Sequence, residues 1–172
     1  MNRKLRDRTE LVDALKPLRG QGKTIVFTNG CFDLIHIGHT RYLDDAKRQG
    51  DILVVGVNSD ASVRIIKPRN RPIVPEDQRA EVVAALACVD FVTIFDEPDP
   101  EHLIRAVLPD VLVKGADWKL EDIIGADIVM DHGGRVERIP LAPGVSTTRI
   151  IEKIISLHQG EKACANAVLP EK

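Results

Sequence analysis

Aromatic residues are scarce in this sequence, which has four phenylalanines, one tyrosine and one tryptophan among 172 residues. So few rings are a poor supply for stacking the bases of a single-stranded nucleic acid. An excess of basic residues is also missing, since the formal charge is −2, and nucleic acids and anionic membranes attract proteins through positive charge. We therefore expect neither nucleic acid nor a membrane as a partner.

Cysteine is equally sparse. Cys31, Cys88 and Cys164 lie far apart, are odd in number and form no CxxC motif, so no disulfide framework is indicated. No apolar run approaches the roughly 20 residues that span a bilayer, and residues 1–8 are too charged to open a secretory signal. These absences predict a cytoplasmic location, with structural or incidental roles for the thiols.

Two familiar phosphate-binding motifs are incomplete. The segment GQGKT at residues 20–24 ends like a phosphate loop, but Pro17 stands where the first glycine belongs, and the expected strand follows the segment instead of preceding it. No GxGxxG follows the first expected strand, which argues against dinucleotide binding of the dehydrogenase type.

What the sequence does have is a regular alternation of apolar runs and amphipathic segments. Residues 24–28 and 51–57 are typical of strands buried on both faces, and residues 39–49 between them have helical spacing. The same patterns predict strands over 90–95, 111–114 and 136–139, and helices over 9–18, 60–66, 75–87, 100–107, 120–130 and 146–157, with the one over 120–130 broken by Gly125. This order predicts an α/β fold: a doubly wound, mainly parallel sheet with helices on both faces, which binds ligands outside the carboxyl ends of its strands.

The length suits one domain of this kind. We expect an N-terminal helix and lead-in over residues 1–22 and the domain itself over residues 23–157. Residues 158–172 have no clear periodic pattern, so we expect a mobile tail there.

The segment GCFDLIHIGH lies where the first strand hands over to its helix. His36 and His39 are one helical turn apart and straddle Gly38. A helix start offers unpaired amides and a partial positive charge, the glycine leaves the backbone accessible, and the imidazoles add donors. Together these features predict an anion site suited to a polyphosphate.

Two other interpretations of the histidines remain. They could be ordinary surface residues, or they could be two ligands of a metal site in a hydrolase. A zinc site needs a third ligand, and Asp33 is the candidate nearby, although an aspartate there can equally orient the loop. The position between strand and helix favours phosphate binding, and we name no protein ligand for a metal.

Two further segments add groups that suit phosphate. Ser146, Thr147 and Thr148 open the last expected helix, where a plain N-cap by Ser146 is the alternative. The segment KPRNRP at residues 67–72 carries three cations after the second βα unit, where a solvated loop is the alternative.

The literal His-Ile-Gly-His motif resembles the HIGH signature of the nucleotidyltransferase superfamily. Over residues 23–155, the chain resembles the adenylyltransferase part of the bifunctional heptose 7-phosphate kinase/heptose 1-phosphate adenylyltransferases. The segments that carry this resemblance are TNGCFDLIHIGH, GVNSDASV, RPIVPEDQRAEVVAAL, VDFVTIF, PDVLVKGADW, IIGADIV and GVSTTRII. Leu141 and Ala142 replace the Arg-Thr pair of glycerol-phosphate cytidylyltransferases, which favours the heptose branch.

The resemblance implies a Rossmann-like nucleotidyltransferase fold and a reaction of ATP with a sugar 1-phosphate, D-glycero-D-manno-heptose 1-phosphate, that gives ADP-heptose and pyrophosphate for a bacterial surface glycan such as lipopolysaccharide. It also implies a homodimer. Mg²⁺ is the expected cofactor, bound mainly through the ATP phosphates. The alternatives are transfer to another phosphorylated alcohol, such as glycerol 3-phosphate or ethanolamine phosphate, with CTP as a possible donor, and a nucleotide-binding module without catalysis.

The resemblance also assigns roles at the matching positions. His36, His39 and Lys67 are the expected catalytic residues. The expected ligands of the sugar phosphate are Lys67, Arg71 and Arg79. The expected nucleotide-binding residues are Thr28, Asn29, Gly30, Phe32, Asp33, Gly38, Lys114, Gly115, Asp117, Ser146, Thr147 and Thr148.

Overall fold

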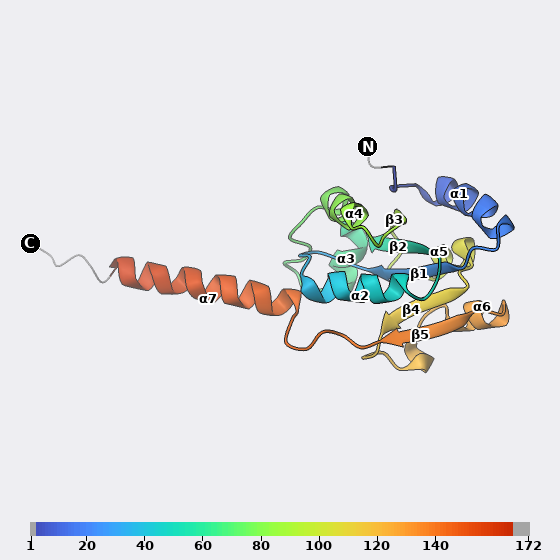
Figure 1. Cartoon of the computed structure of the whole chain (residues 1–172). Helices are drawn as coiled ribbons and strands as arrows, with labels where there is room; N and C mark the ends of the chain where they lie inside the picture. The colour runs from blue at the N-terminus through green and yellow to red at the C-terminus, as the bar shows by residue number, and fades with distance from the viewer. Residues whose placement is uncertain (1–2, 167–172) are drawn as a thin grey trace, which may run out of the picture.

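The computed structural model describes residues 3–166, with side chains to residue 159. Its centre is a parallel sheet in the order β3-β2-β1-β4-β5 (Figure 1). The strands are β1 (Ile25–Gly30), β2 (Ile52–Asn58), β3 (Phe91–Phe95), β4 (Val111–Gly115) and β5 (Arg135–Ile139). The expected parallel α/β sheet is confirmed.

The central strands are buried on both faces, which is why they read as continuous apolar runs. Along β1, Val26 packs into the core on one face of the sheet, whereas Ile25 and Phe27 pack into the core on the other. Along β4, Leu112 belongs to the second core and its neighbours Val111 and Val113 to the first.

Helices cover both faces of the sheet. Leu43 of α2 and Val83 of α4 pack into the first core, and Leu15 of α1, Leu103 of α5 and Val129 of α6 pack into the second. The helices are α1 (Arg8–Gly20), α2 (Ile37–Lys47), α3 (Asp60–Ile66), α4 (Glu76–Ala85), α5 (Glu101–Val107), α6 (Ala126–Asp131) and α7 (Thr147–Asn166), with a 3₁₀ turn η1 (Leu120–Asp122).

The N-terminal segment is more than a lead-in. Its backbone pairs with the outer edge of β3: Arg6 N–H donates to Val92 O at 3.0 Å, and Val92 N–H donates to Lys4 O at 2.9 Å. Helix α1 then buries Leu11 and Leu15 completely in the second core. Residues before the first strand therefore complete the domain.

The break expected at Gly125 within residues 120–130 is confirmed: Gly125 adopts a left-handed φ of 84°, with the Ile104 side chain packed against it, and separates η1 from α6. One expected helix differs from the structure. The last helix was expected to end at residue 157, but α7 runs to Asn166 and projects away from the domain (Figure 1). Within the expected tail, residues 167–172 lie outside the described residues, and its mobility stays a prediction. In the described part of the chain, no helix has the length and apolar character to cross a membrane.

The strand order places a crevice at one edge of the sheet. Strand β1 is central, with β2 on one side and β4 on the other. The chain runs from β1 through β2 to β3 on one side and then crosses back to β4 on the other side of β1. In such folds, the crevice at the point where the strand order reverses binds ligands. The HIGH segment begins directly after β1, at this crevice.

Candidate active site

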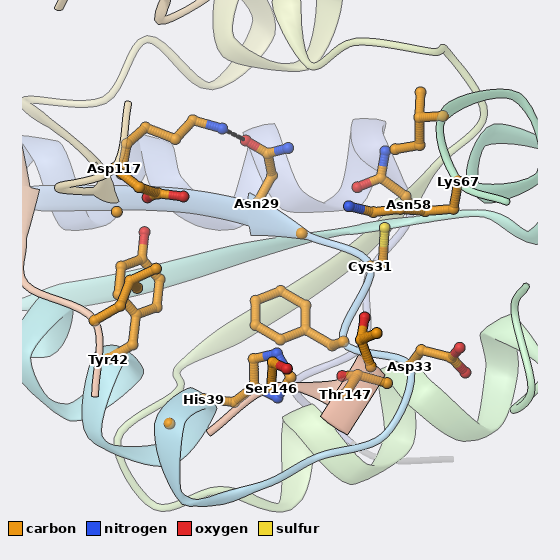
Figure 2. A pocket seen from close by; sticks show the side chains of 18 of the residues that line it. Asn29, Cys31, Asp33, His39, Tyr42, Asn58, Lys67, Asp117, Ser146 and Thr147 are labelled. Carbon is orange, nitrogen blue, oxygen red and sulfur yellow. Dashed lines mark hydrogen bonds between the residues drawn. The ribbon is translucent and has the colours of Figure 1, made fainter. Parts of the chain in front are cut away.

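A cleft of about 840 Å³ opens at the carboxyl ends of the strands (Figure 2). Its walls come from the ends of β1, β2 and β4, from the loop after β3, and from the segment that joins β5 to α7. Segments far apart in the sequence thus meet at one place, as the strand-end rule predicts.

The two histidines lie together at the start of α2. His36 is the N-cap of this helix, and its Nδ1 accepts a hydrogen bond from Gly38 N–H at 3.1 Å. In the neutral ring, Nε2 therefore carries the proton and is a donor. The rings of His36 and His39 stack with centroids 3.9 Å apart and planes 19° apart.

This geometry gives Gly38 and the first amides of α2 roles that differ from the expected ones. A Cβ at position 38 would lie 2.9 Å from His36 Cε1, so the glycine makes room for the imidazole. The Gly38 amide is held by His36, and the amides of His39 and Thr40 donate to His36 O. The expectation of a row of unpaired amides here is therefore wrong for these three. Among these groups, the Nε2–H of His36 is the donor that remains.

His39 packs against the Phe32 ring and interacts with the backbone of Leu34. The Phe32 ring meets it edge-on at 5.4 Å, and within residues 3–159 no partner reaches its buried Nδ1. Burial, together with the neighbouring His36, lowers the pKa of His39 to about 4. The ring is therefore neutral near pH 7. Phe32 itself has a left-handed φ of 47°, an unusual conformation for a bulky residue.

Asp33 fixes the shape of the cleft rather than facing into open space. Its side chain is fully buried, forms an ion pair with Arg71 Nε, and accepts hydrogen bonds from the amides of Ile73 and Val74 at 2.9 and 2.8 Å. Burial opposes ionisation, but these two amides and the Arg71 guanidinium hold the pKa of Asp33 below its ordinary value. Asp33 therefore anchors the cationic segment to the β1–α2 corner.

The alternative of a metal centre gains no support from this arrangement. Asp33, the nearby candidate for a third ligand under that alternative, is engaged by Arg71 and two amides. Across the described part of the chain, no group of three or more histidine, cysteine or acidic side chains is arranged to hold a metal ion.

The three candidate ligands of the sugar phosphate separate in the structure. Lys67, at the end of α3, and Arg71 line the cleft. Arg79 does not line it: the side chain is fully buried and donates to Val74 O at 2.9 Å and Asn58 O at 2.8 Å, to Cys31 O, and to Asp60 Oδ1 at 2.8 Å. The expected phosphate role of Arg79 is therefore corrected to a structural one.

The end of β4 contributes a half-buried cation. Lys114 Nζ donates to Asn29 Oδ1 across neighbouring strands, and burial lowers the pKa of Lys114 to about 8 (Figure 2). Asp117 folds back over Gly115, where a Cβ would collide with its Oδ1. Thr28, in the neighbouring strand β1, is fully buried, and its hydroxyl oxygen lies 2.8 Å from Tyr42 Oη.

The start of α7 lines the same cleft as the residues at the end of β4. Ser146 Oγ accepts from Arg149 N–H at 3.2 Å, so the N-cap that was the alternative interpretation is present. Thr147 Oγ1 donates to Leu34 O at 3.5 Å, which joins α7 to the HIGH segment. Ser146, Thr147 and Thr148 all line the cleft, so the cap and the expected binding position coincide.

Several lining residues escaped the sequence reasoning. Asn58 is the last residue of β2 and is 2% exposed, so the strand-end rule could have found it. Asp99, Trp118 and Cys31 lie in loops and carried no spacing signal. Burial raises the pKa of the Cys31 thiol, which disfavours the reactive thiolate.

Comparison with known proteins shows the family of this chain. The family description cytidylyltransferase-like matches residues 27–153. This chain belongs to that family. This family contains nucleotidyltransferases. The resemblance of the chain to the nucleotidyltransferase superfamily, first indicated by its HIGH motif, is thereby confirmed.

Relatives extend the likeness over nearly the whole chain. The bifunctional protein HldE of Syntrophotalea carbinolica is 52% identical over 156 residues, which are 91% of this chain and 32% of that protein. HldE of Campylobacter jejuni is 53% identical over 88% of this chain and 32% of that protein. The chain thus spans about a third of the length of these relatives.

Two solved structures share the fold. A lipopolysaccharide core biosynthesis protein from Thermoplasma volcanium matches with a TM-score of 0.59 and 30% identity, over 70% of this chain and 98% of that one. Pantoate-beta-alanine ligase from Francisella tularensis matches with a TM-score of 0.57 over 79% of this chain and 66% of that one, and at 16% identity it supports the fold alone.

The setting of His39 predicts an unusual titration. Its ring should titrate near pH 4 in the ligand-free protein, because burial and His36 disfavour the cation. The unfolded chain binds the proton more readily, with a pKa of 6.5. His39 therefore reduces stability as the pH falls from 6.5 toward 4. Ring chemical shifts followed by NMR, assigned with His39→Gln, would measure the pKa, and a midpoint at or above 6.5 would contradict this account.

The buried position of Arg79 predicts a loss of stability rather than of affinity. Arg79→Met keeps much of the volume but leaves Asp60 and three carbonyl oxygens without their donor, at a cost of about 3–5 kcal/mol in urea unfolding. Arg105→Met, which removes an exposed pair with Glu101, is the control and should change little. A stable Arg79→Met protein with a raised KM for a sugar phosphate would restore the phosphate role.

Proposed function

We propose that this chain transfers AMP from ATP to D-glycero-D-manno-heptose 1-phosphate, giving ADP-heptose and pyrophosphate. The observation that carries the proposal is the pair of stacked imidazoles at the start of α2, which shares one cleft with Lys67, Arg71 and Lys114. Sequence segments that resemble heptose adenylyltransferases and the likeness to HldE and a lipopolysaccharide core biosynthesis protein support the acceptor.

The reaction is a direct displacement at phosphorus. An oxygen of the sugar phosphate, already ionised at neutral pH, forms a bond to the α-phosphorus of ATP. The bond from that phosphorus to the oxygen bridging to the β-phosphate breaks, and pyrophosphate leaves with the electron pair. No proton has to be removed from the nucleophile, so positioning and charge stabilisation supply the catalysis.

The imidazoles supply donors to the phosphates. His36 directs its Nε2–H away from the helix, because its Nδ1 is held by the Gly38 amide. His39 stacks beside it as a neutral ring. A preorganised donor that meets charge growing on the leaving pyrophosphate stabilises the transition state. Ser146, Thr147 and Thr148 at the start of α7 are the second set of groups for the triphosphate.

The cations bring two anions together. Lys67 and Arg71 enter the cleft from the segment after α3, and Arg71 is oriented by Asp33. We assign Lys67 to the sugar phosphate and to the transferred phosphoryl group, with Arg71 beside it. Without these charges, repulsion between sugar phosphate and ATP would oppose the approach of the nucleophile.

The nucleoside belongs at the end of β4 in this proposal. Asp117 suits the hydroxyl groups of a ribose, Lys114 lines the same cleft and would meet a phosphate, and Gly115 leaves room for the Asp117 side chain. Adenine is the proposed base. The family description favours a test of cytosine as well, since its members are grouped as cytidylyltransferase-like.

Mg²⁺ fits this site as an ion that arrives with the nucleotide. The described residues offer no protein cluster for it, and Mg²⁺ commonly binds through substrate phosphates and a few carboxylates. When bound, it would neutralise triphosphate charge.

The expected homodimer stays a prediction.

The direct test is pyrophosphate release from purified protein. ATP and heptose 1-phosphate together should release pyrophosphate and form ADP-heptose, detected by mass spectrometry. CTP in place of ATP, and glycerol 3-phosphate or ethanolamine phosphate in place of the sugar, should be much poorer substrates. A preference for one of these alternatives would replace the proposed substrates, and ATP binding without turnover on any acceptor would favour a non-catalytic module.

The role of His36 can be separated from its helix cap. His36→Asn keeps an acceptor for the Gly38 amide but removes the Nε2 donor, and kcat should fall about 10²–10³-fold with a much smaller change in ATP affinity. Lys119→Ala changes an exposed cation outside the cleft and is the control. A kcat of His36→Asn within a few-fold of the unmodified protein would reject the donor role.

A further inference from the structure

Besides the buried Asp33, which is paired with Arg71, carboxylates line the cleft at two separate places. Asp117 follows β4, and Asp99 lies in the loop after β3. Strands β3 and β4 are separated by β2 and β1, a distance of about 14 Å at the usual spacing between strands. Lys67, His36 and His39 enter the cleft from the units between them. Along the carboxyl ends of the strands, groups that suit phosphate therefore lie between Asp99 and Asp117.

A carboxylate in a cleft for two anions needs a partner other than phosphate. An ionised carboxylate accepts hydrogen bonds and donates none, and two like charges repel. Asp33 satisfies this requirement with Arg71 and backbone amides. Asp99 makes no such ion pair within the described residues. A hydroxyl group of a substrate would be a suitable donor to it.

Asp99 is also fixed in position. One of its oxygens, Oδ1, accepts from Glu101 N–H at 3.0 Å. Pro98 and Pro100 flank it, and each proline ring restricts the backbone on its side. A carboxylate has about four acceptor sites on its two oxygens, so most of its capacity remains after this one bond. The side chain is a preorganised acceptor.

The neighbouring strand end adds a buried amide. Asn58, at the end of β2, lines the cleft with 2% of its surface exposed (Figure 2). Its Nδ2 donates to Ser62 Oγ at 2.9 Å, which sets the orientation of the amide. Lys67 follows α3, the next helix in the chain, and lines the same cleft. An acceptor, an amide and a cation are thus all available to one phosphorylated polyol.

We propose that Asp99 and Asn58 form the sugar subsite of this cleft. The Asp99 carboxylate accepts hydrogen bonds from hydroxyl groups of the acceptor sugar, Asn58 contacts the same sugar, and Lys67 receives its phosphate. This assignment rests on the proposed function and defines the acceptor class as a polyhydroxylated sugar phosphate. A short acceptor, such as glycerol 3-phosphate, has fewer hydroxyl groups with which to reach Asp99.

The decisive variant is Asp99→Asn, which keeps a side-chain oxygen for the Glu101 amide and removes the charge. KM for heptose 1-phosphate should rise about 10- to 100-fold, the usual effect of weakening hydrogen bonds to a charged group, with KM for ATP within about twofold. Glu101→Gln changes an acid two residues away that pairs with Arg105 and lies outside the cleft lining, and it should leave both values unchanged. Thermal unfolding of each variant checks that the fold is intact.

Binding without turnover separates this inference from the proposed function. Calorimetry with a non-hydrolysable ATP analogue present would measure the Kd of heptose 1-phosphate, other sugar 1-phosphates and ethanolamine phosphate. Loss of sugar affinity in Asp99→Asn supports the subsite, even if the sugar that reacts is not the heptose. An unchanged Kd and KM for every sugar phosphate overturns the subsite but leaves the reaction standing. Binding of ethanolamine phosphate alone also overturns it, because an ammonium group would then be the partner of Asp99.

Discussion

The buried Asp33 carboxylate is the constraint on which the rest of the cleft depends. An ionised group removed from water needs complete compensation, and Asp33 obtains it from Arg71 and the amides of Ile73 and Val74. These partners are about forty residues later in the chain. Their contacts hold the segment after α3 against the corner that carries the histidines. The position of Lys67 relative to His36 therefore follows from an interaction that involves neither of them directly.

In the cleft, the neutral hydrogen-bond donors and the positive charges belong to different side chains. Its two imidazoles are close and stacked, and one of them is buried. Protonating both would place two cations face to face, so neutral donors are the stable state before substrate binds. Positive charge comes from longer side chains on the surrounding loops, such as Lys67 and Arg71.

The sequence predicted what local patterns determine. Apolar runs such as residues 24–28 and 51–57, and the alternation of strand and helix patterns, predicted the strands of the sheet, and the strand-to-helix corner indicated His36 and His39. The fate of Arg79 was not predictable, because a cation near a cationic segment looks the same whether its partners are phosphates or carbonyl oxygens supplied by distant loops. The reason for Gly38 depended on the rotamer of His36. Asp99 became visible only when the fold brought the loop after β3 to the cleft.

The two outer strands of the sheet are protected in different ways. At β5, charged residues such as Arg135 and Glu137 discourage another strand from adding. At β3, the protection is the backbone of residues 4–6, which occupies the hydrogen-bonding positions along Val92. Shortening the chain at its beginning would uncover a row of amides and carbonyls beside apolar side chains. Self-association through that edge, rather than damage to the distant catalytic groups, would then limit how well a trimmed protein behaves in solution.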